Sequence, residues 1–143
     1  MFSYRQRTAS LQELQDELRH SIPDPSAPPD LLQLEKLPYL RGCIKEGIRL
    51  SWGTTARNQR LHPTPLVYKD WVIPARTPVG MNPVNFLSGT LIYVNPHAFV
   101  PERWAEHAEA PNGVSLEHYF VPFGKGASQC LGMKYVRSAA GSD

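Results

Sequence analysis

The sequence predicts an α+β fold with two helices, a small sheet, a long irregular segment and a short final helix. Apolar residues recur at helical spacing in the first 51 positions, and short runs of β-branched and aromatic residues follow them. Fourteen prolines among 143 residues, about twice average usage, exclude a chain made mostly of long helices. The length fits a single domain over residues 1–143, with no second domain.

Charge and cysteine content exclude several classes of protein. Fifteen basic and 13 acidic side chains leave a formal charge of +2, too small for a dedicated nucleic-acid surface. No apolar run approaches the ~20 residues that a membrane span requires. Two cysteines, Cys43 and Cys130, are too few for a disulfide scaffold, and the five histidines show no zinc-ligand spacing. We therefore expect no nucleic-acid partner and no membrane span in this chain.

Two helices are expected in the first third of the chain. The first covers residues 10–20, where Ser10 and Glu13 fit a capping box and three leucines share one face. Prolines then make residues 22–30 a stiff loop. The second helix covers residues 38–51, because proline suits a first helical turn and an apolar stripe follows it.

Short strands are expected after these helices. Residues 66–69 and 77–81 have the composition of strands around a turn at residues 70–76, and residues 91–94 are a candidate third strand. Residues 95–129 carry four prolines and scattered glycines, so they are expected to be mostly irregular. A long irregular stretch in a compact domain is typical of a functional or disordered segment.

The densest motif is a glycine-rich loop over residues 123–132, Phe-Gly-Lys-Gly-Ala-Ser-Gln-Cys-Leu-Gly. Three glycines at fixed offsets have a chance of ~3 in 10,000 from average glycine usage. A phosphate loop and a dinucleotide fingerprint are both excluded, because each lacks one of its glycines here. One alternative is a simple glycine turn before a helix, with Cys130 as a small buried residue.

The chemical alternative is a thiolate presented by this loop. A short helix is expected to begin around residues 130–131, where its dipole and backbone N–H groups favour an anionic Cys130 sulfur. Small residues in the loop allow a flat cofactor to approach the backbone, and Phe123 would shield the sulfur from water. Thiolate ligation of haem iron fits this combination.

The loop resembles the cysteine-ligand loop of cytochrome P450, the haem-thiolate monooxygenases. The family pattern Phe-x-x-Gly-x-Arg-x-Cys-x-Gly is matched by Phe123, Gly126, Cys130 and Gly132. The resemblance implies haem (iron protoporphyrin) as cofactor and Cys130 as the axial iron ligand. Ser128 stands where the family usually has an arginine that contacts a haem propionate.

Two further family motifs occur upstream in the expected order. Glu46-Gly47-Ile48-Arg49 matches the Glu-x-x-Arg of helix K, and residues 101–104 match the Pro-Glu-Arg segment of the meander. In the family these residues form an ionic triad behind the haem, here Glu46, Arg49 and Arg103. Taken alone, the first motif would suit an exposed ion pair worth ~0.2–0.5 kcal/mol. The order of all three motifs favours the triad.

The resemblance also implies roles for residues at three other places in the sequence. Arg57 and Arg60 follow helix K, and Arg60 is the candidate partner of a haem propionate, with a solvated basic loop as the alternative. Residues 52–55 align with a substrate-lining segment. Arg76 stands where many relatives place a glycine, so a strained or reshaped turn is expected there.

The resemblance covers about residues 8–136 and is strongest to fungal microsomal-type members. It implies a C-terminal, proximal haem-side fragment of the mainly helical P450 fold: helices J and K, a small sheet, the meander, the cysteine loop and the start of helix L. The Ala-Gly-x-Asp-Thr pattern of the oxygen-activating helix is absent from the sequence. No catalytic residue is therefore expected within this chain.

Two functions remain open. The first is part of a monooxygenase that inserts one oxygen atom from O₂ into a small lipophilic substrate, with electrons from an NADPH-dependent reductase. The second is a non-catalytic, truncated P450-derived product of a pseudogene or partial gene model, with at most an interaction role. Family members are usually anchored to the endoplasmic-reticulum membrane, but no anchor is present in this sequence, so its location stays open.

Overall fold

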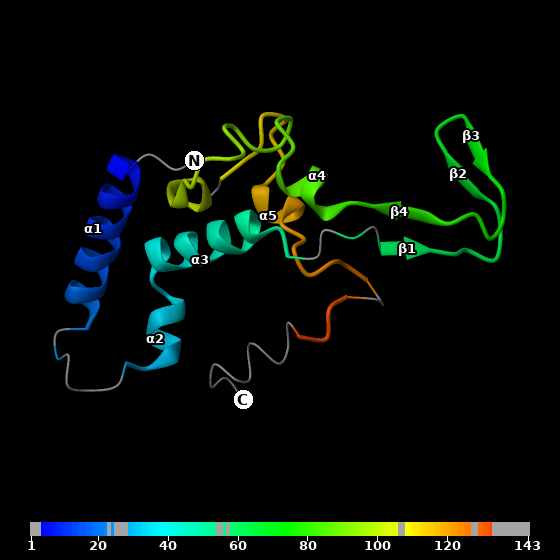
Figure 1. Cartoon of the computed structure of the whole chain (residues 1–143). Helices are drawn as coiled ribbons and strands as arrows, with labels where there is room; N and C mark the ends of the chain where they lie inside the picture. The colour runs from blue at the N-terminus through cyan, green and yellow to red at the C-terminus, as the bar shows by residue number, and fades with distance from the viewer. Residues whose placement is uncertain are drawn as a thin grey trace.

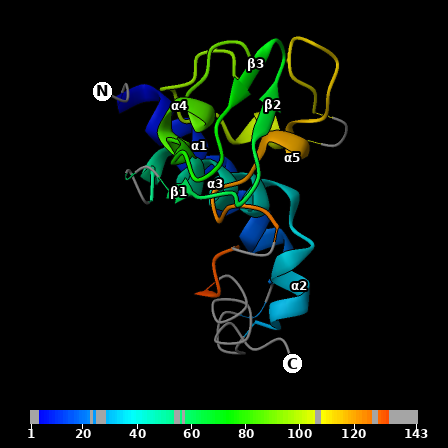
Figure 2. The same cartoon turned by 90° about the vertical axis from the view of Figure 1, so that its right-hand side faces the viewer.

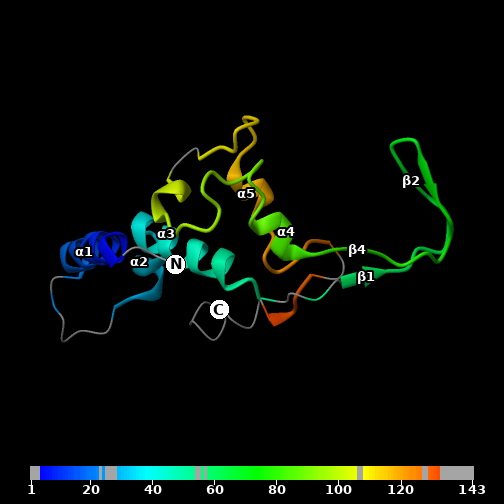
Figure 3. The ribbon, with the colours of Figure 1, turned by 45° about the horizontal axis from the view of Figure 1, so that its top comes forward.

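The computed structural model has a helical body from which a long β-arm projects (Figures 1 and 3). Helices α1 (Tyr4–Ser21), α2 (Leu31–Glu35) and α3 (Pro38–Ser51) lie in the body, and α4 (Pro83–Leu87) and α5 (Leu116–Tyr119) lie where the arm leaves it. The α+β class expected from the sequence is confirmed. The structure describes residues 4–22, 24, 29–53, 56, 58–105, 108–126 and 129–132.

Helix α1 (Tyr4–Ser21) begins earlier than the sequence predicts. The predicted capping box at Ser10 is wrong, because the preceding residues continue the helix and Ser10 lies inside it. A short helix that the sequence analysis missed, α2 (Leu31–Glu35), follows the proline-rich loop. Its N-cap is Asp30, whose carboxylate accepts a hydrogen bond from the Leu32 amide at 3.2 Å.

The predicted bounds of helix α3 (Pro38–Ser51) are confirmed. Pro38 occupies the first turn, where its missing N–H costs nothing. The helix ends at Trp52, whose φ of 54° lies in the left-handed region that terminates helices. This helix carries both Glu46 and Arg49, so its position determines where that pair lies.

Two antiparallel ladders make up the arm. At its base β1 (Asn58–Arg60) pairs with β4 (Val79–Met81), and at its far end β2 (Leu66–Tyr68) pairs with β3 (Trp71–Ile73). Figure 2, turned to face the arm, shows the hairpin of β2 and β3 in front of the body.

The expected turn over residues 70–76 is wrong. Residues 71–73 pair with residues 66–68, so the hairpin turns at Lys69 and Asp70, where Lys69 has a φ of 52°. Arg76 has a φ of 59°, as expected for a residue in the place of a glycine. Its amide donates to the His62 carbonyl at 2.8 Å, which joins the two sides of the arm.

The candidate strand at residues 91–94 is also wrong, because these residues form turns. Within this part of the chain, Tyr93 is completely buried and belongs to the core with Trp104, Ala110 and Leu116. Three short helices interrupt the segment after β4: α4 (Pro83–Leu87), the 3-10 helix η1 (Pro101–Trp104) and α5 (Leu116–Tyr119). No helix among the described residues is long and apolar enough to cross a membrane.

Candidate functional site

Glu46 and Arg49 form a buried ion pair one turn apart on α3. The Arg49 Nε donates to Glu46 Oε2 at 2.9 Å, and Arg49 Nη2 donates to Oε1 at 2.8 Å. Both side chains are 0% exposed. This two-point geometry fixes the guanidinium plane against the carboxylate. The pair is therefore fully buried, unlike the exposed ion pair that the Glu-x-x-Arg motif taken alone would suit.

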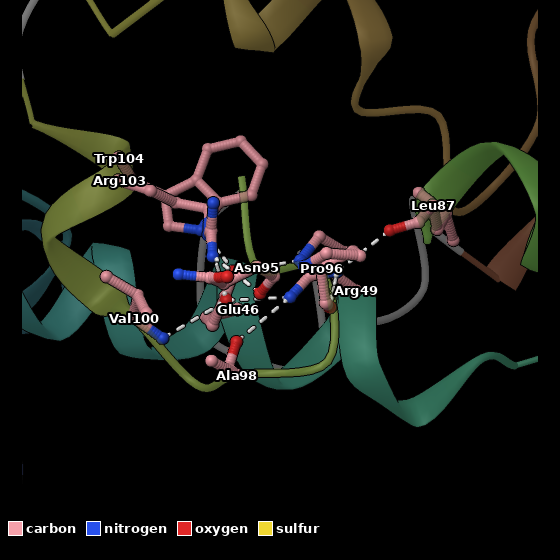
Figure 4. Close-up of polar contacts among 9 residues, drawn as sticks. All are labelled: Glu46, Arg49, Leu87, Asn95, Pro96, Ala98, Val100, Arg103 and Trp104. Carbon is pink, nitrogen blue, oxygen red and sulfur yellow. Dashed lines mark hydrogen bonds and ion pairs between the residues drawn. The ribbon is translucent and has the colours of Figure 1, made fainter. Parts of the chain in front are cut away.

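The segment of residues 95–104, which ends in η1 and is called the meander below, brings three more donors to the same carboxylate (Figure 4). Arg103 Nε lies 3.0 Å from Glu46 Oε1, and the Val100 amide donates to the same oxygen at 3.2 Å. Trp104 Nε1 donates to Oε2 at 2.9 Å. The structure thus brings Glu46, Arg49 and Arg103 together. The sequence analysis missed Trp104 and Val100, although Trp104 directly follows the Pro-Glu-Arg motif.

Arg49 also binds the backbone that leads from α4 to η1. Its Nη1 donates to the carbonyl oxygens of Leu87 at 2.8 Å and Pro96 at 2.6 Å, and its Nη2 donates to Ala98 at 3.2 Å. One side chain therefore holds the end of α4 and two points of the irregular segment after it against α3. Every residue type has a backbone carbonyl, so the sequence could not indicate which carbonyls bind Arg49.

The Glu46 carboxyl remains ionised in this site. Burial by itself would raise the pKa of Glu46, because removal from water disfavours the charged form. The hydrogen bonds and charge of Arg49 oppose this effect, with help from Arg103 and the Val100 amide. The net result is a pKa below the usual value of 4.5. The cluster is therefore a set of fixed charges at neutral pH, with no proton to transfer.

A second set of contacts fixes the other end of α3. Both oxygens of the Glu17 carboxylate on α1 accept backbone hydrogen bonds at 2.8 Å, one from Tyr39 and one from Leu40. The Tyr39 hydroxyl donates to Glu102 on η1 at 3.0 Å. Burial, opposed by a Ser10 hydrogen bond and supported by Glu102, raises the pKa of Tyr39 to about 12. Helix α3 is thus held at both ends, which positions its Glu46 and Arg49.

The cysteine loop is closed by backbone hydrogen bonds. The Cys130 amide donates to the Phe123 carbonyl at 2.9 Å, and the Gln129 amide donates to Gly126 at 3.0 Å. Gly124 and Gly126 have φ values of 76° and 82°, which side-chain-bearing residues rarely adopt. Glycine at these positions therefore allows the tight path that leads back to Cys130.

The residues of this loop fit a haem ligand. Cys130 is an exposed free thiol, and a Cβ built on Gly132 would lie 3.5 Å from its sulfur. Gly132 thus lies directly beside the sulfur, where a Cβ would be in ordinary van der Waals contact with it. A single exposed sulfur in a backbone-closed loop has the donor chemistry of a haem thiolate. Cys43 is half-buried on α3, and burial raises the pKa of its thiol, which disfavours a thiolate there.

Aromatic packing connects the cluster to this loop. The Trp104 ring, which donates to Glu46, packs edge-on against Phe120 with ring centroids 4.8 Å apart. Phe120 follows α5 and directly precedes the segment that enters the loop at Phe123. A continuous series of contacts, Glu46–Trp104–Phe120, therefore leads from the ionic cluster to the segment that enters the cysteine loop.

Other expected site residues are not brought into the cluster. Arg60 lies exposed at the end of β1, where its Nη1 donates to the neighbouring Gln59 carbonyl at 3.2 Å. Trp52 ends α3 and lies edge-on to His97, with ring centroids 6.3 Å apart. Arg57, Ser128 and the two threonines of residues 52–55 lie outside the described residues.

Comparison with known proteins identifies the family. Residues 8–137 match the family model described as Cytochrome P450. The chain belongs to the cytochrome P450 family. Members of this family are haem-binding monooxygenases, so the family and cofactor expected from the sequence are confirmed.

Fungal P450s are among its similar relatives. The chain is 47% identical over 127 residues to cytochrome P450 monooxygenase sdnE of Sordaria araneosa, which covers 87% of this chain and 25% of that protein. It is 45% identical over 125 residues to fusicoccadiene C-8 hydroxylase of Phomopsis amygdali, covering 86% of this chain and 23% of that protein. The chain therefore spans about a quarter of the length of these curated relatives.

A solved P450 structure has the same fold. The retinoic-acid-bound cyanobacterial CYP120A1 superimposes with a TM-score of 0.76 at 23% sequence identity. The match covers 92% of this chain and 29% of that structure. The arrangement of α3, the arm and the meander is therefore a part of the P450 fold.

Proposed function

We propose that this chain provides the proximal side of the haem site in a monooxygenase, with Cys130 as the axial iron ligand. The observation that supports this most directly is the closed loop from Phe123 to Cys130 with its exposed thiol. Haem held by a thiolate supplies the chemistry of the reaction, in which one atom of O₂ enters the substrate and the other leaves as water.

The side chains of this chain then have distinct roles. Cys130 donates electron density as a thiolate, while Gly126 and Gly132 permit the loop geometry around it. Glu46, Arg49 and Arg103 would touch no reacting atom and instead hold the meander against α3. They are positioning residues of the site.

Contacts to the haem propionates are part of the same proposal. Arg60 is exposed at the base of the arm, and its guanidinium is bound only weakly to its own backbone neighbour, so it is available to a carboxylate. Ser128 takes the place of the usual arginine and cannot supply a second charged donor. We therefore expect Arg60 to carry more of the propionate binding here than in relatives that have both arginines.

The substrate is proposed to be a small lipophilic molecule, and the electron donor an NADPH-dependent reductase. The names of two relatives, fusicoccadiene C-8 hydroxylase and N-acetyltryptophan 6-hydroxylase, support oxygen insertion as the reaction class. These two substrates differ widely in structure, so the proposal extends to the reaction and not to one substrate.

The test uses a chimaera in which this chain replaces the matching segment of the Sordaria araneosa monooxygenase, called the chimaeric P450 below. The reduced protein under carbon monoxide is expected to show the red-shifted Soret band of a thiolate-ligated haem. An unshifted band would reject thiolate ligation. A chimaeric P450 that folds but takes up no haem would favour the non-catalytic alternative.

A further inference from the structure

Tyr93 contacts the ionic cluster but belongs to none of the motifs that identify it. Its side chain is 0% exposed, and its ring lies 4.9 Å from Arg49 Cζ and 5.9 Å from Arg103 Cζ. Within the described residues, its hydroxyl has no hydrogen-bond partner. The ring therefore contacts two guanidiniums while the polar end of the side chain contributes no bond.

The charges of the cluster explain why an aromatic ring is favourable here. One carboxylate, Glu46, faces two guanidiniums, so one positive charge is in excess. The exposed fraction is 0% for Glu46 and Arg49 and 9% for Arg103, so water screens this excess poorly. The N–H donors of Arg49 bond to Glu46 and to three backbone carbonyls, and because these donors lie in the guanidinium plane, they leave its faces to other partners. The negative π face of a tyrosine attracts such cations.

We propose that Tyr93 is a positioning residue of the cluster, whose π face holds Arg49 and Arg103 in place against Glu46. The ring, and not the hydroxyl, performs this role. Burial, opposed by Arg49, raises the pKa of Tyr93 to about 12, so the phenol is neutral and the ring keeps its ordinary charge distribution near neutral pH. The proposal rests on the proposed function only in that the cluster supports the haem site.

Simple packing is the competing explanation, because Tyr93 also lies 6.2 Å from the Trp104 ring. Shape and charge can be separated by fluorination, which keeps the size of a phenylalanine ring nearly constant but weakens its π face stepwise. The experiment therefore places Phe, Leu, and Phe carrying one, two or three fluorines at position 93 of the haem-loaded chimaeric P450. The Tm, the unfolding rate in urea and the carbon monoxide spectrum are measured for each variant.

We expect Tyr93→Phe to retain Tm and spectrum, and Tyr93→Leu to lower Tm. Each added fluorine should lower Tm further, and the unfolding rate should rise about fivefold from Phe to the trifluorinated ring. The matched control is the same series at Phe86, which packs at 5.9 Å from Tyr119 and has no guanidinium against its ring among the contacts of the described residues. Fluorination there should leave Tm nearly unchanged.

Two results would overturn the proposal. A flat fluorine series at position 93 would show that the ring only fills space. A Tyr93→Phe variant as unstable as Tyr93→Leu would show that the hydroxyl carries the effect. The fluorine series decides the matter even if Tyr93→Leu does not fold. Failure of the proposed function would appear separately, as an unshifted carbon monoxide band in the unsubstituted chimaeric P450.

Discussion

Gly42 of α3 lies so close to the Pro101 carbonyl of η1 that a Cβ built on Gly42 would meet this oxygen at 2.6 Å. Real Cβ atoms essentially never approach backbone oxygen this closely. The close approach lets α3 and the meander share the carboxylate of Glu46. A small residue at this position is therefore a requirement of the ionic cluster, although it contributes no charge.

Gly42→Ala should separate α3 from η1 and destabilise the chimaeric P450 by about 1–3 kcal/mol, the typical cost of overpacking. Gly47 is a matched control on the same helix, because a Cβ there would meet nothing within 4 Å. Gly47→Ala should be neutral or stabilising by up to about 1 kcal/mol, through helix propensity alone. Denaturant unfolding of both variants checks this, and equal effects would contradict the close-approach argument.

Removal of Glu46 should be far more costly than removal of an exposed acidic partner. Glu46→Ala leaves two guanidiniums out of water without their carboxylate, at an expected cost of ~3–5 kcal/mol. The control is Asp16→Ala, which breaks an exposed pair with Arg19 at 3.4 Å and should change stability by less than about 0.5 kcal/mol. Unfolding free energy and haem content are measured together. Unchanged values for Glu46→Ala would remove the cluster from any supporting role.

Acid pH should weaken the cluster in a defined window. The folded-state pKa of Glu46 lies below its usual value of 4.5, so the ionised form stabilises the fold above that value. This stabilisation should be lost as pH falls from about 4.5 through the lowered folded-state pKa. The measurement is Tm against pH for the chimaeric P450 and its Glu46→Gln variant. Their difference should be constant near neutral pH and shrink in acid; a constant difference down to the lowest pH would contradict the assignment.

Glu17 should act as the N-terminal cap of α3, although it lies on α1. The N-cap residue Leu37 has no capping side chain, and Glu17 accepts the Tyr39 and Leu40 amides in its place. Glu17→Ala should cost about 0.5–2 kcal/mol, the range of other caps. Amide hydrogen exchange at Tyr39 and Leu40 should accelerate. Exposed Glu13 on the same helix is the control, and equal acceleration in Glu13→Ala would exclude a specific cap.

The sequence predicted those parts of the fold that depend on residues close together in the chain. The bounds of α3 followed from Pro38 and the apolar stripe behind it. Strand β1 has the sequence Asn-Gln-Arg, without any alternation of apolar residues, and forms only because β4 lies beside it. Residues 91–94 have strand composition, but Tyr93 is drawn into the core against Arg49 and Trp104. Tertiary contacts override local propensity in such short segments.

The residues of the candidate site were likewise predictable only in part. Family motifs indicated Glu46, Arg49, Arg103 and Cys130, because each is a side chain at a fixed spacing. Val100 and the carbonyls around Arg49 contribute backbone atoms, which any residue type supplies. Glu17 and Tyr93 act through positions reached only after folding, so the sequence gives no sign of their roles.

The most direct test of the account compares the two cysteines of this chain as iron ligands. Cys130→Ser and Cys43→Ser are made separately in the chimaeric P450, and each reduced protein is examined under carbon monoxide. Cys130→Ser should abolish the red-shifted Soret band, because a hydroxyl cannot supply the electron donation of a thiolate. Cys43→Ser should leave the band intact, since Cys43 is a half-buried residue of α3. A thiolate band that survives Cys130→Ser, or disappears only with Cys43→Ser, would contradict the assignment of the haem ligand.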